Sequence, residues 1–294
     1  MVGGRFGTVR AATAAGCGAI LLWSALAVLA TMAGPVPPFQ MTAMAFALGF
    51  SLAAAKWIAG REPVGRHLAL PPRVWALGIG GLFGYHACYF AALALAPPVE
   101  ANLINYLWPL LIVVFSGLLP GERLRWWNLA GAVAGLAGCV LLVGGSAAGL
   151  ELRYAAGYGA ALGAALIWSG YSVLSRRVRE VPTDAVGAFC GATAVLALIA
   201  HLLFEQTYVP RGGEWLALLA LGFGPVGIAF YLWDRGVKRG DIKALGALSY
   251  MTPLLSTLLL VLFGRAEPSL RLALACVLIV GGAILASREL WGRR

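Results

Sequence analysis

An uncharged stretch of 45 residues constrains this chain more than any other feature. Residues 11–55 contain no Asp, Glu, Lys or Arg. A helix needs about 20 consecutive apolar residues to cross the hydrocarbon core of a bilayer. The composition extends this pattern to all 294 residues, because 61% of them are hydrophobic and 12% are charged. Soluble domains are about half apolar and a quarter charged. The sequence therefore predicts a polytopic helical membrane protein.

Ten apolar runs predict ten transmembrane helices in an all-α fold. They cover approximately residues 11–33, 38–57, 74–95, 99–119, 126–145, 155–175, 184–204, 214–233, 242–263 and 269–287. The connections between them are too short to hold a soluble domain. A cleaved signal peptide has an apolar region of about 7–15 residues, which is shorter than the first run. We therefore interpret that run as a retained span.

The distribution of the basic residues predicts the orientation in the membrane. The net charge is +10, from 22 Lys and Arg against 12 Asp and Glu. With the N-terminus inside, 18 of the 22 basic residues fall in inner segments and 4 in outer ones. Short loops rich in Lys and Arg stay cytoplasmic. We expect a multi-pass protein of the bacterial inner (plasma) membrane with both termini cytoplasmic, in contact with lipid headgroups. Nucleic acid is not an expected partner.

Two phrases recur with nearly the same spacing, which indicates an internal repeat. "LLWSALAVL" at 21–29 resembles "LIWSGYSVL" at 166–174, and "NYLWPLL" at 105–111 resembles "SYMTPLL" at 249–255. Residues 1–150 and 151–294 then form two halves of five helices each. Because five is odd, the halves must have inverted topology. Inverted repeats around a central site are a recurrent plan of secondary transporters.

The second pair of phrases also predicts where a substrate would bind. Pro109 and Pro253 each interrupt an apolar run at an equivalent place, and such interruptions point to a midplane site. Polar residues at helical spacing accompany each proline on one face, which should turn away from lipid. The two stripes are Asn102, Asn105, Tyr106 and Pro109, and Gly246, Ser249, Tyr250 and Pro253. A single kinked helix would mean little, because proline is common in membrane helices.

Further candidates for the binding site are aromatic or repeated in the two halves. They are Tyr85 and Tyr89, Tyr231, and the pairs Trp23–Ser24 and Trp168–Ser169. Simple packing is the alternative for the tyrosines, and hydrogen bonding of serine to its own helix is common in membranes. Gly131, Gly135, Gly138, Gly281 and Gly282 are interpreted as helix contacts rather than chemistry.

His86 is the ionisable side chain nearest the middle of a span. It could carry a coupling proton, or it could be a neutral, hydrogen-bonded core histidine, which we favour. The five cysteines all lie in apolar runs without a CxxC pair, so burial is expected rather than metal binding or disulfide formation. We expect no catalytic residues, no metal and no cofactor, because neither HExxH nor paired carboxylates occur within the spans.

The chain resembles the drug/metabolite transporter superfamily, in particular its EamA-type exporters. The resemblance covers essentially the whole chain and is carried by the stretch from Ala92 to Leu142, with "EANLINYLWPLL" followed by "GERL". These motifs are similar to those of the YddG-like aromatic amino acid exporters. The resemblance implies a basket-like fold with a central cavity and export of aromatic and other neutral amino acids. In the second half "GRAEPSL" replaces "GERL".

Three functions remain to be compared. The first is alternating-access export of neutral, mainly aromatic amino acids, and the second is export of another neutral amphiphilic metabolite or drug. The third is an intramembrane enzyme, which would need a catalytic constellation that the spans do not contain. A scaffold or assembly subunit would give no reason for two matched polar faces with prolines. The expected partners are a small-molecule substrate and membrane lipids, and a monomer is compatible with the sequence.

Overall fold

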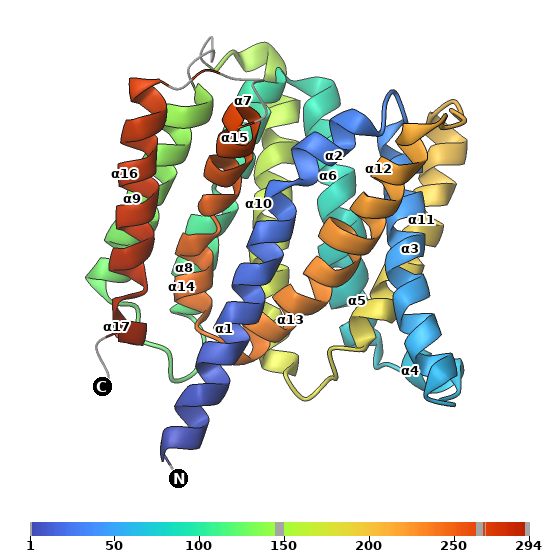
Figure 1. Cartoon of the computed structure of the whole chain (residues 1–294), viewed down its shortest axis with the longest axis horizontal. Coiled ribbons are helices and arrows are strands. Elements are labelled where there is room, and N and C mark those ends of the chain that lie inside the picture. The colour runs from blue at the N-terminus through green and yellow to red at the C-terminus, as the bar shows by residue number, and fades with distance from the viewer. Residues whose placement is uncertain (1, 145–149, 263–266, 268, 292–294) are drawn as a thin grey trace.

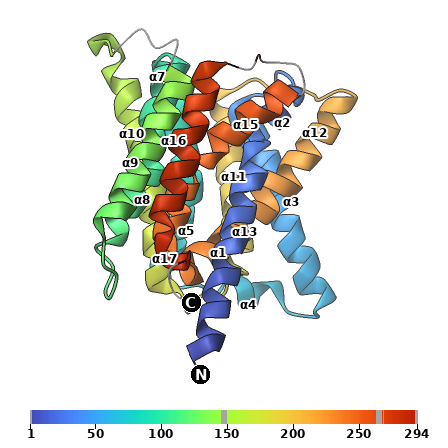
Figure 2. The same ribbon diagram turned by 60° about the vertical axis from the view of Figure 1, so that its left-hand side comes forward.

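The computed structural model describes residues 2–144, 150–262, 267 and 269–291. Within these ranges all regular structure is helical, without a β-strand. The long helices form one bundle, and the two chain ends lie at the same face of it (Figure 1). We call this face the chain-end face, and the other the opposite face. The same arrangement is seen after a turn of 60° (Figure 2). The all-helical class predicted from the sequence is confirmed for the described residues.

In the first part of the chain we describe ten helical elements, which lie within residues 2–143. They are α1 (Val2–Ser24), α2 (Leu26–Met32), α3 (Pro38–Ala59), α4 (Val64–Leu68), α5 (Pro72–Ile79), the π-helix η1 (Gly80–Gly84), α6 (Tyr85–Leu95), α7 (Pro98–Asn105), α8 (Trp108–Ser116) and α9 (Trp126–Val143). Proline opens α3, α5 and α7. Its fixed φ suits the first helical position, where no N–H partner is required.

The second part follows a similar order. Its elements are the 3₁₀-helix η3 (Leu152–Tyr154), α10 (Ala155–Ser175), the 3₁₀-helix η4 (Arg176–Val178), α11 (Ala185–Phe204), α12 (Gly213–Leu221), the π-helix η5 (Gly222–Ile228), α13 (Ala229–Arg239), α14 (Ile242–Leu248), α15 (Met251–Leu262), α16 (Leu270–Ala286) and α17 (Arg288–Trp291).

All ten apolar runs predicted from the sequence coincide with helical segments. Among the described residues, eight helical stretches are long and apolar enough to cross a membrane. The last run corresponds to α16, which is apolar but has 17 residues. The sixth corresponds to α10, of 21 residues, which is not one of the eight. The protein is therefore an integral membrane protein, while ten spans and an inverted repeat remain predictions.

Two spans are interrupted close to Pro109 and Pro253, as the sequence predicts. Helix α7 ends at Asn105, residues 106–107 form a turn, and α8 begins at Trp108 with Pro109 in its first turn. Helix α14 ends at Leu248, residues 249–250 form a turn, and α15 begins at Met251. Proline cannot donate the backbone hydrogen bond of a continuous helix. The prediction of two broken helices is confirmed.

Two other spans contain π-helical turns that the sequence analysis did not anticipate. Segment η1 separates α5 from α6, and η5 separates α12 from α13. Both are rich in glycine, with the sequences GGLFG and GFGPVGI. Pro225 lies inside η5, where its missing N–H breaks the regular hydrogen-bond ladder. π-turns within α-helices are frequent at functional sites.

Helices α9 and α16 pack against each other through glycines. A Cβ atom added to Gly131 would overlap the carbonyl oxygen of Gly282, and one added to Gly282 would overlap that of Gly131. Small residues at such an interface let two backbones approach closely. Gly281, which the sequence analysis grouped with Gly282, has nothing near its Cβ position and is exposed. The packing role is confirmed for Gly131 and Gly282, and does not hold for Gly281.

A central cavity as the candidate substrate site

A cavity of about 570 Å³ lies inside the bundle. This volume is within the range of roughly 300–1,000 Å³ typical of small-molecule sites. Residues of α1, α2, α3, α6, α7, α8, α9, α10, α12, η5, α13 and α15 line it, together with Val36 and Tyr106. None of the described residues that line it is Asp, Glu, Lys or Arg. The cavity therefore suits a ligand that is neutral overall and has an apolar part.

Aromatic rings close the cavity toward the chain-end face. Trp23 is the only residue that α1 contributes to the described lining, and it stands one residue before the end of that helix. Its ring centroid is 5.6 Å from that of Trp168 and 5.9 Å from that of Phe230, both with edge-on geometry. Trp108 also lines the cavity, and its ring centroid is 6.1 Å from that of Trp233, which lies outside the lining. These rings form an aromatic floor.

A hydrogen bond fixes the orientation of one floor residue. Trp23 Nε1 donates to the carbonyl oxygen of Pro225, at 2.9 Å. Pro225 lies in η5, where the π-turn leaves carbonyl groups outside the regular ladder. The π-turn of the second half therefore holds a ring supplied by the first half. This contact joins residues 202 positions apart in the chain.

The wall of the cavity carries two tyrosine–asparagine pairs. Tyr89 Oη donates to Asn102 Oδ1 at 2.6 Å, and Asn105 Nδ2 donates to Tyr85 Oη at 3.2 Å. The rings of Tyr85 and Tyr89 are nearly parallel, at an interplanar angle of 4°, with centroids 5.9 Å apart. The spacing of four residues on α6 places both tyrosines on one helix face, opposite the asparagines of α7.

His86 also lines the cavity, with a fixed ring orientation. Its Nδ1 is 2.7 Å from the carbonyl oxygen of Leu82. A carbonyl oxygen can only accept a hydrogen bond, so Nδ1 must carry a proton. In a neutral ring, Nε2 is then a hydrogen-bond acceptor. Phe46 and Phe90 surround the imidazole with ring centroids 5.2 and 5.9 Å away. The hydrogen bond to Leu82 is compatible with the neutral ring and with the charged one, so the neutral state of His86 stays a prediction.

The two broken spans meet beside the cavity. Tyr250 Oη donates to the carbonyl oxygen of Tyr106 at 3.1 Å. A Cβ atom added to Gly246 would lie 3.0 Å from the carbonyl oxygen of Pro109, so α14 and α8 approach closely. In hydrocarbon, a carbonyl released by a helix break needs a protein partner. Tyr250 supplies that partner to the turn at Tyr106.

The structure brings nine of the fifteen candidate residues to the cavity and leaves six away from it. Those in the lining are Trp23, Tyr85, His86, Tyr89, Asn102, Asn105, Tyr106, Trp168 and Pro253. Those outside it are Ser24, Pro109, Ser169, Tyr231, Ser249 and Tyr250. Three of these are serines whose hydroxyls donate to carbonyls of their own helices: Leu21, Ala165 and Leu245. Tyr231 Oη reaches the carbonyl of Gly49 instead.

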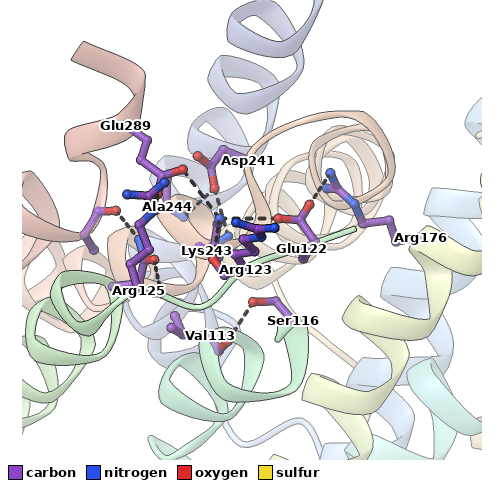
Figure 3. A network of polar contacts seen from close by, with 12 residues as sticks. Val113, Ser116, Glu122, Arg123, Arg125, Arg176, Asp241, Lys243, Ala244 and Glu289 are labelled. Atoms are coloured by element: carbon purple, nitrogen blue, oxygen red, sulfur yellow. Dashed lines mark hydrogen bonds and ion pairs between the residues drawn. The ribbon is translucent and has the colours of Figure 1, made fainter. Parts of the chain in front are cut away.

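An ion-pair network (Figure 3) includes a residue of α17, and α17 lies at the chain-end face (Figure 1). Glu122 lies between Arg176, at 3.0 Å, and Lys243, at 3.3 Å. Glu289 lies 3.6 Å from Lys243 and 3.3 Å from Arg125. These five residues, which we call the Glu122 network, come from the α8–α9 connection, the end of α10, the start of α14 and α17. They tie residues of the first part of the chain to residues of the second.

Asp241 borders the Glu122 network and caps α14. Its Oδ1 accepts from the backbone N–H groups of Lys243 and Ala244, at 3.1 and 3.0 Å. Burial raises the pKa of Asp241 above its usual value, against the opposing effect of these hydrogen bonds and of Lys243. Among the described residues, no cluster of three or more His, Cys, Asp or Glu is placed to hold a metal ion.

Comparison with known families decides the class of this protein. The model of the EamA-like transporter family matches residues 11–144 and again residues 155–288. This chain belongs to the EamA-like transporter family. Its membership agrees with the predicted superfamily and with the long apolar helices. The family is one of transporters, and the relatives named below are exporters.

Named relatives of the EamA-like protein include amino acid exporters. The aromatic amino acid exporter YddG of Ancylobacter novellus is 56% identical over 279 residues, which cover 94% of this chain and 96% of that protein. The protein of the same name from Salmonella typhimurium is 24% identical over 95% of this chain and 97% of its own. A solved crystal structure that is 55% identical superposes with a TM-score of 0.90, covering 96% of this chain and 99% of the other.

Sequence reasoning missed several residues that line the cavity of this EamA-like transporter. Phe46, Trp108, Phe230 and Thr252 all belong to the lining. Trp108 and Thr252 stand directly inside the repeated phrases "NYLWPLL" and "SYMTPLL", so the repeat could have identified them. Phe46 and Phe230 carry no such signal, because a phenylalanine within an apolar run is indistinguishable from a core residue or a residue facing lipid.

Proposed function

We propose that this protein exports aromatic and other neutral amino acids across the bacterial inner membrane by alternating access. The observation that carries the proposal is the central cavity, which combines an aromatic floor with uncharged polar groups on one wall. A zwitterion with an apolar side chain matches both parts. The names of the two YddG relatives support the same substrate class.

The charge distribution gives the cavity an orientation in the membrane. The lining includes residues of α2 and of the first turns of α3, and both segments lie toward the opposite face (Figure 1). The positive-inside rule assigns the chain-end face to the cytoplasm. In this orientation the cavity lies toward the outside, and the aromatic floor and the Glu122 network close the cytoplasmic side.

Alternating access follows from the two matched halves. We interpret residues 1–150 and 151–294 as inverted five-helix repeats, on the evidence of the recurrent phrases, the paired helix breaks and the paired π-turns. Transporters of this plan rock one repeat against the other around a fixed site. The Glu122 network joins the two halves, so its ion pairs must separate whenever the cytoplasmic side opens.

Efflux from proteoliposomes tests the proposal. Purified protein in vesicles loaded with labelled phenylalanine should release the label faster than protein-free vesicles do. Unlabelled tryptophan and tyrosine should compete, while aspartate and lysine should not, because the described lining carries no charged side chain. Repeating the assay with an imposed pH gradient separates facilitated transport from proton exchange. No efflux from correctly inserted protein would contradict the proposal.

A second substrate class is favoured by one comparison. A relative 23% identical over 80% of this chain is named a probable terminal-alkyne amino-acid exporter in Streptantibioticus cattleyicolor. The aromatic floor would also accept an apolar chain of another shape, since dispersion contacts are not directional. Competition by aliphatic and alkynyl amino acids in the same assay measures how far the substrate range extends beyond aromatic rings.

A further inference from the structure

Two polar atoms beside the cavity are buried without a hydrogen-bond partner. They are Asn105 Oδ1 and Thr252 Oγ1, and neither finds a partner among the residues that the structure describes. Both residues line the cavity, and Asn105 as a whole is only 4% exposed. Buried polar atoms are nearly always paired, and an unpaired one is a reason to look for a ligand.

The Asn105 side chain is held in a defined orientation. Its Nδ2 donates to Tyr85 Oη, which leaves Oδ1 as the atom without a partner. Asn105 is the last residue of α7, directly before the turn that precedes α8. In the neighbouring Asn102 both polar atoms have a partner, because Oδ1 accepts from Tyr89 and Nδ2 donates to the carbonyl of Pro98. Of the two side-chain oxygens, only Asn105 Oδ1 lacks a partner among the described residues.

Thr252 is unusual for a hydroxyl residue in a helix. Such side chains commonly bond to the carbonyl four residues earlier. Thr257 of the same helix does so, donating to Pro253 at 2.9 Å, and Ser249 donates to Leu245 at 2.7 Å. Thr252 makes no such bond within the described residues. The Thr252 hydroxyl therefore has no hydrogen-bond partner among the described residues, although Thr252 lines the cavity.

The two unpaired atoms belong to residues beside the hydrogen bond between Tyr250 and Tyr106, which connects the two helix breaks. We call this region the joint. Asn105 stands one residue before Tyr106, and Thr252 stands two residues after Tyr250. Tyr250 Oη donates to the Tyr106 carbonyl, so the two helix breaks are held together. The two unpaired atoms thus come from the two helix breaks that this hydrogen bond joins, and both residues line the same cavity.

We propose that Asn105 Oδ1 and Thr252 Oγ1 form the subsite that accepts the ammonium group of the substrate. An ammonium has three donors and no acceptor, so two neutral oxygen acceptors complement it. A lining without carboxylates then binds the cation through dipoles and leaves the cavity neutral. This inference rests on the proposed function, since it assigns one group of the proposed amino acid substrate to named atoms.

The subsite divides the substrate between the two parts of the cavity. With the ammonium at the joint of the broken helices, the side chain extends over the aromatic floor of Trp23 and Trp168. The contribution of the joint is specific to the amino group, while the floor accepts rings of different size. An analogue without an amino group should therefore lose contact with the joint and keep contact with the floor.

Two fragments of phenylalanine test this assignment. 2-Phenylethylamine keeps the ammonium and lacks the carboxylate, and 3-phenylpropionate does the reverse. Each fragment competes with labelled phenylalanine in a counterflow assay. The assay is run with reconstituted wild type, Asn105→Leu, Thr252→Val and Thr257→Val. The last variant is the control, because the Thr257 hydroxyl is paired within its own helix. Asn105→Leu and Thr252→Val should weaken inhibition by the amine about tenfold or more, because a hydrogen bond to a charged group is lost. Inhibition by 3-phenylpropionate should be the same in all variants. In Thr257→Val, inhibition by both fragments should match the wild type.

Asn105→Asp identifies which atom of the amide faces the ligand. The substitution keeps an oxygen acceptor and removes the nitrogen donor, so inhibition by 2-phenylethylamine should be retained or strengthened. The assignment is overturned if Asn105→Asp abolishes binding of the amine, if Asn105→Leu weakens the acid instead, or if both fragments weaken equally.

A binding measurement keeps the inference separate from the transport proposal. Addition of 2-phenylethylamine should raise the thermal stability of the detergent-solubilised wild type, and the shift should disappear in Asn105→Leu. If phenylalanine counterflow is absent but this shift is present, the proposed function fails and the ammonium subsite stands. If wild-type protein transports phenylalanine and the amine gives no Asn105-dependent shift or inhibition, the subsite is overturned alone.

Discussion

Tyr250 Oη donates a hydrogen bond of 3.1 Å to the backbone carbonyl of Tyr106, the residue that stands 144 positions earlier in the matching phrase. Each tyrosine lies in the turn that interrupts a membrane-spanning segment. The side chain of one break therefore satisfies the backbone of the other. A carbonyl at the first break, which would be costly if left unpaired in lipid, is thus stabilised by a side chain of the second.

The first prediction concerns this bond. Tyr250→Phe should destabilise the folded protein by about 1–3 kcal/mol, because the Tyr106 carbonyl is left buried without its donor. Transport should fall as well, since the two breaks are no longer held together. Denaturation in detergent and efflux from vesicles measure the two effects. Tyr154→Phe is the matched control, and equal losses in both variants would show that Tyr250 has no special role.

The contact between α9 and α16 gives a prediction about packing. Gly131→Leu should lower stability by about 1–3 kcal/mol or more, because the side chain would overlap the backbone at Gly282. Gly281→Leu places the same bulk on an exposed face of α16 with nothing near its Cβ position. It should leave the melting temperature within experimental error. Comparable destabilisation by both substitutions would contradict this account of the interface.

Removing the central carboxylate of the Glu122 network should loosen the chain-end face. Glu122→Gln leaves Arg176 and Lys243 without their shared anion, and the Lys243 side chain is only 8% exposed. We expect easier opening of this face. In protein lacking the native cysteines, Ser175→Cys, buried at the end of α10, should react faster with a membrane-impermeant thiol reagent when Glu122→Gln is added.

Glu151→Gln is the control for that measurement. Glu151 pairs with Arg153 in an exposed position, where ion pairs contribute little. The labelling rate of the reporter cysteine should be the same with and without this change. If Glu122→Gln also leaves the rate unchanged, the Glu122 network does not hold this face closed.

Asp241 gives a prediction about pH. Its pKa is raised in the folded protein by burial, so folding favours the protonated form. The carboxyl group then opposes folding increasingly as pH rises from its unfolded pKa through its raised folded pKa. Asp241→Asn keeps an acceptor for the N–H groups of Lys243 and Ala244. The variant should match the wild type in acid and be more stable at neutral pH. A wild type more stable than the variant at pH 7 would contradict this.

The sequence predicted the parts of the fold that follow from the bilayer. Uncharged runs of adequate length must be helices in hydrocarbon, and the two prolines must interrupt them, so the breaks at Tyr106 and Tyr250 were predictable. The π-turns were not. A glycine-rich segment such as residues 80–84 is compatible with a regular helix, and only tertiary packing decides that it widens into a π-turn.

The candidate site was predictable only where polarity and repetition coincided. Asn105 and Tyr106 were found because a polar stripe must avoid lipid. Ser249 and Tyr250 occupy the equivalent stripe, yet Ser249 bonds to its own helix and Tyr250 is committed to Tyr106. Gly135, interpreted as a helix contact, packs against the ring of Tyr250. Repetition in the sequence marks equivalent positions, but the inexact symmetry of the fold gives them different partners.

The pairing of Tyr85 with Asn105 and of Tyr89 with Asn102 has a physiological consequence. Polar groups that already satisfy one another gain little from an incoming ligand, because a substrate offers them no bond that they lack. Under the proposed function, we expect affinity to come from a few unused atoms and from the aromatic floor, and therefore to be modest. An exporter of modest affinity would transport little at ordinary concentrations of a valuable metabolite and would remove it faster only when it accumulates.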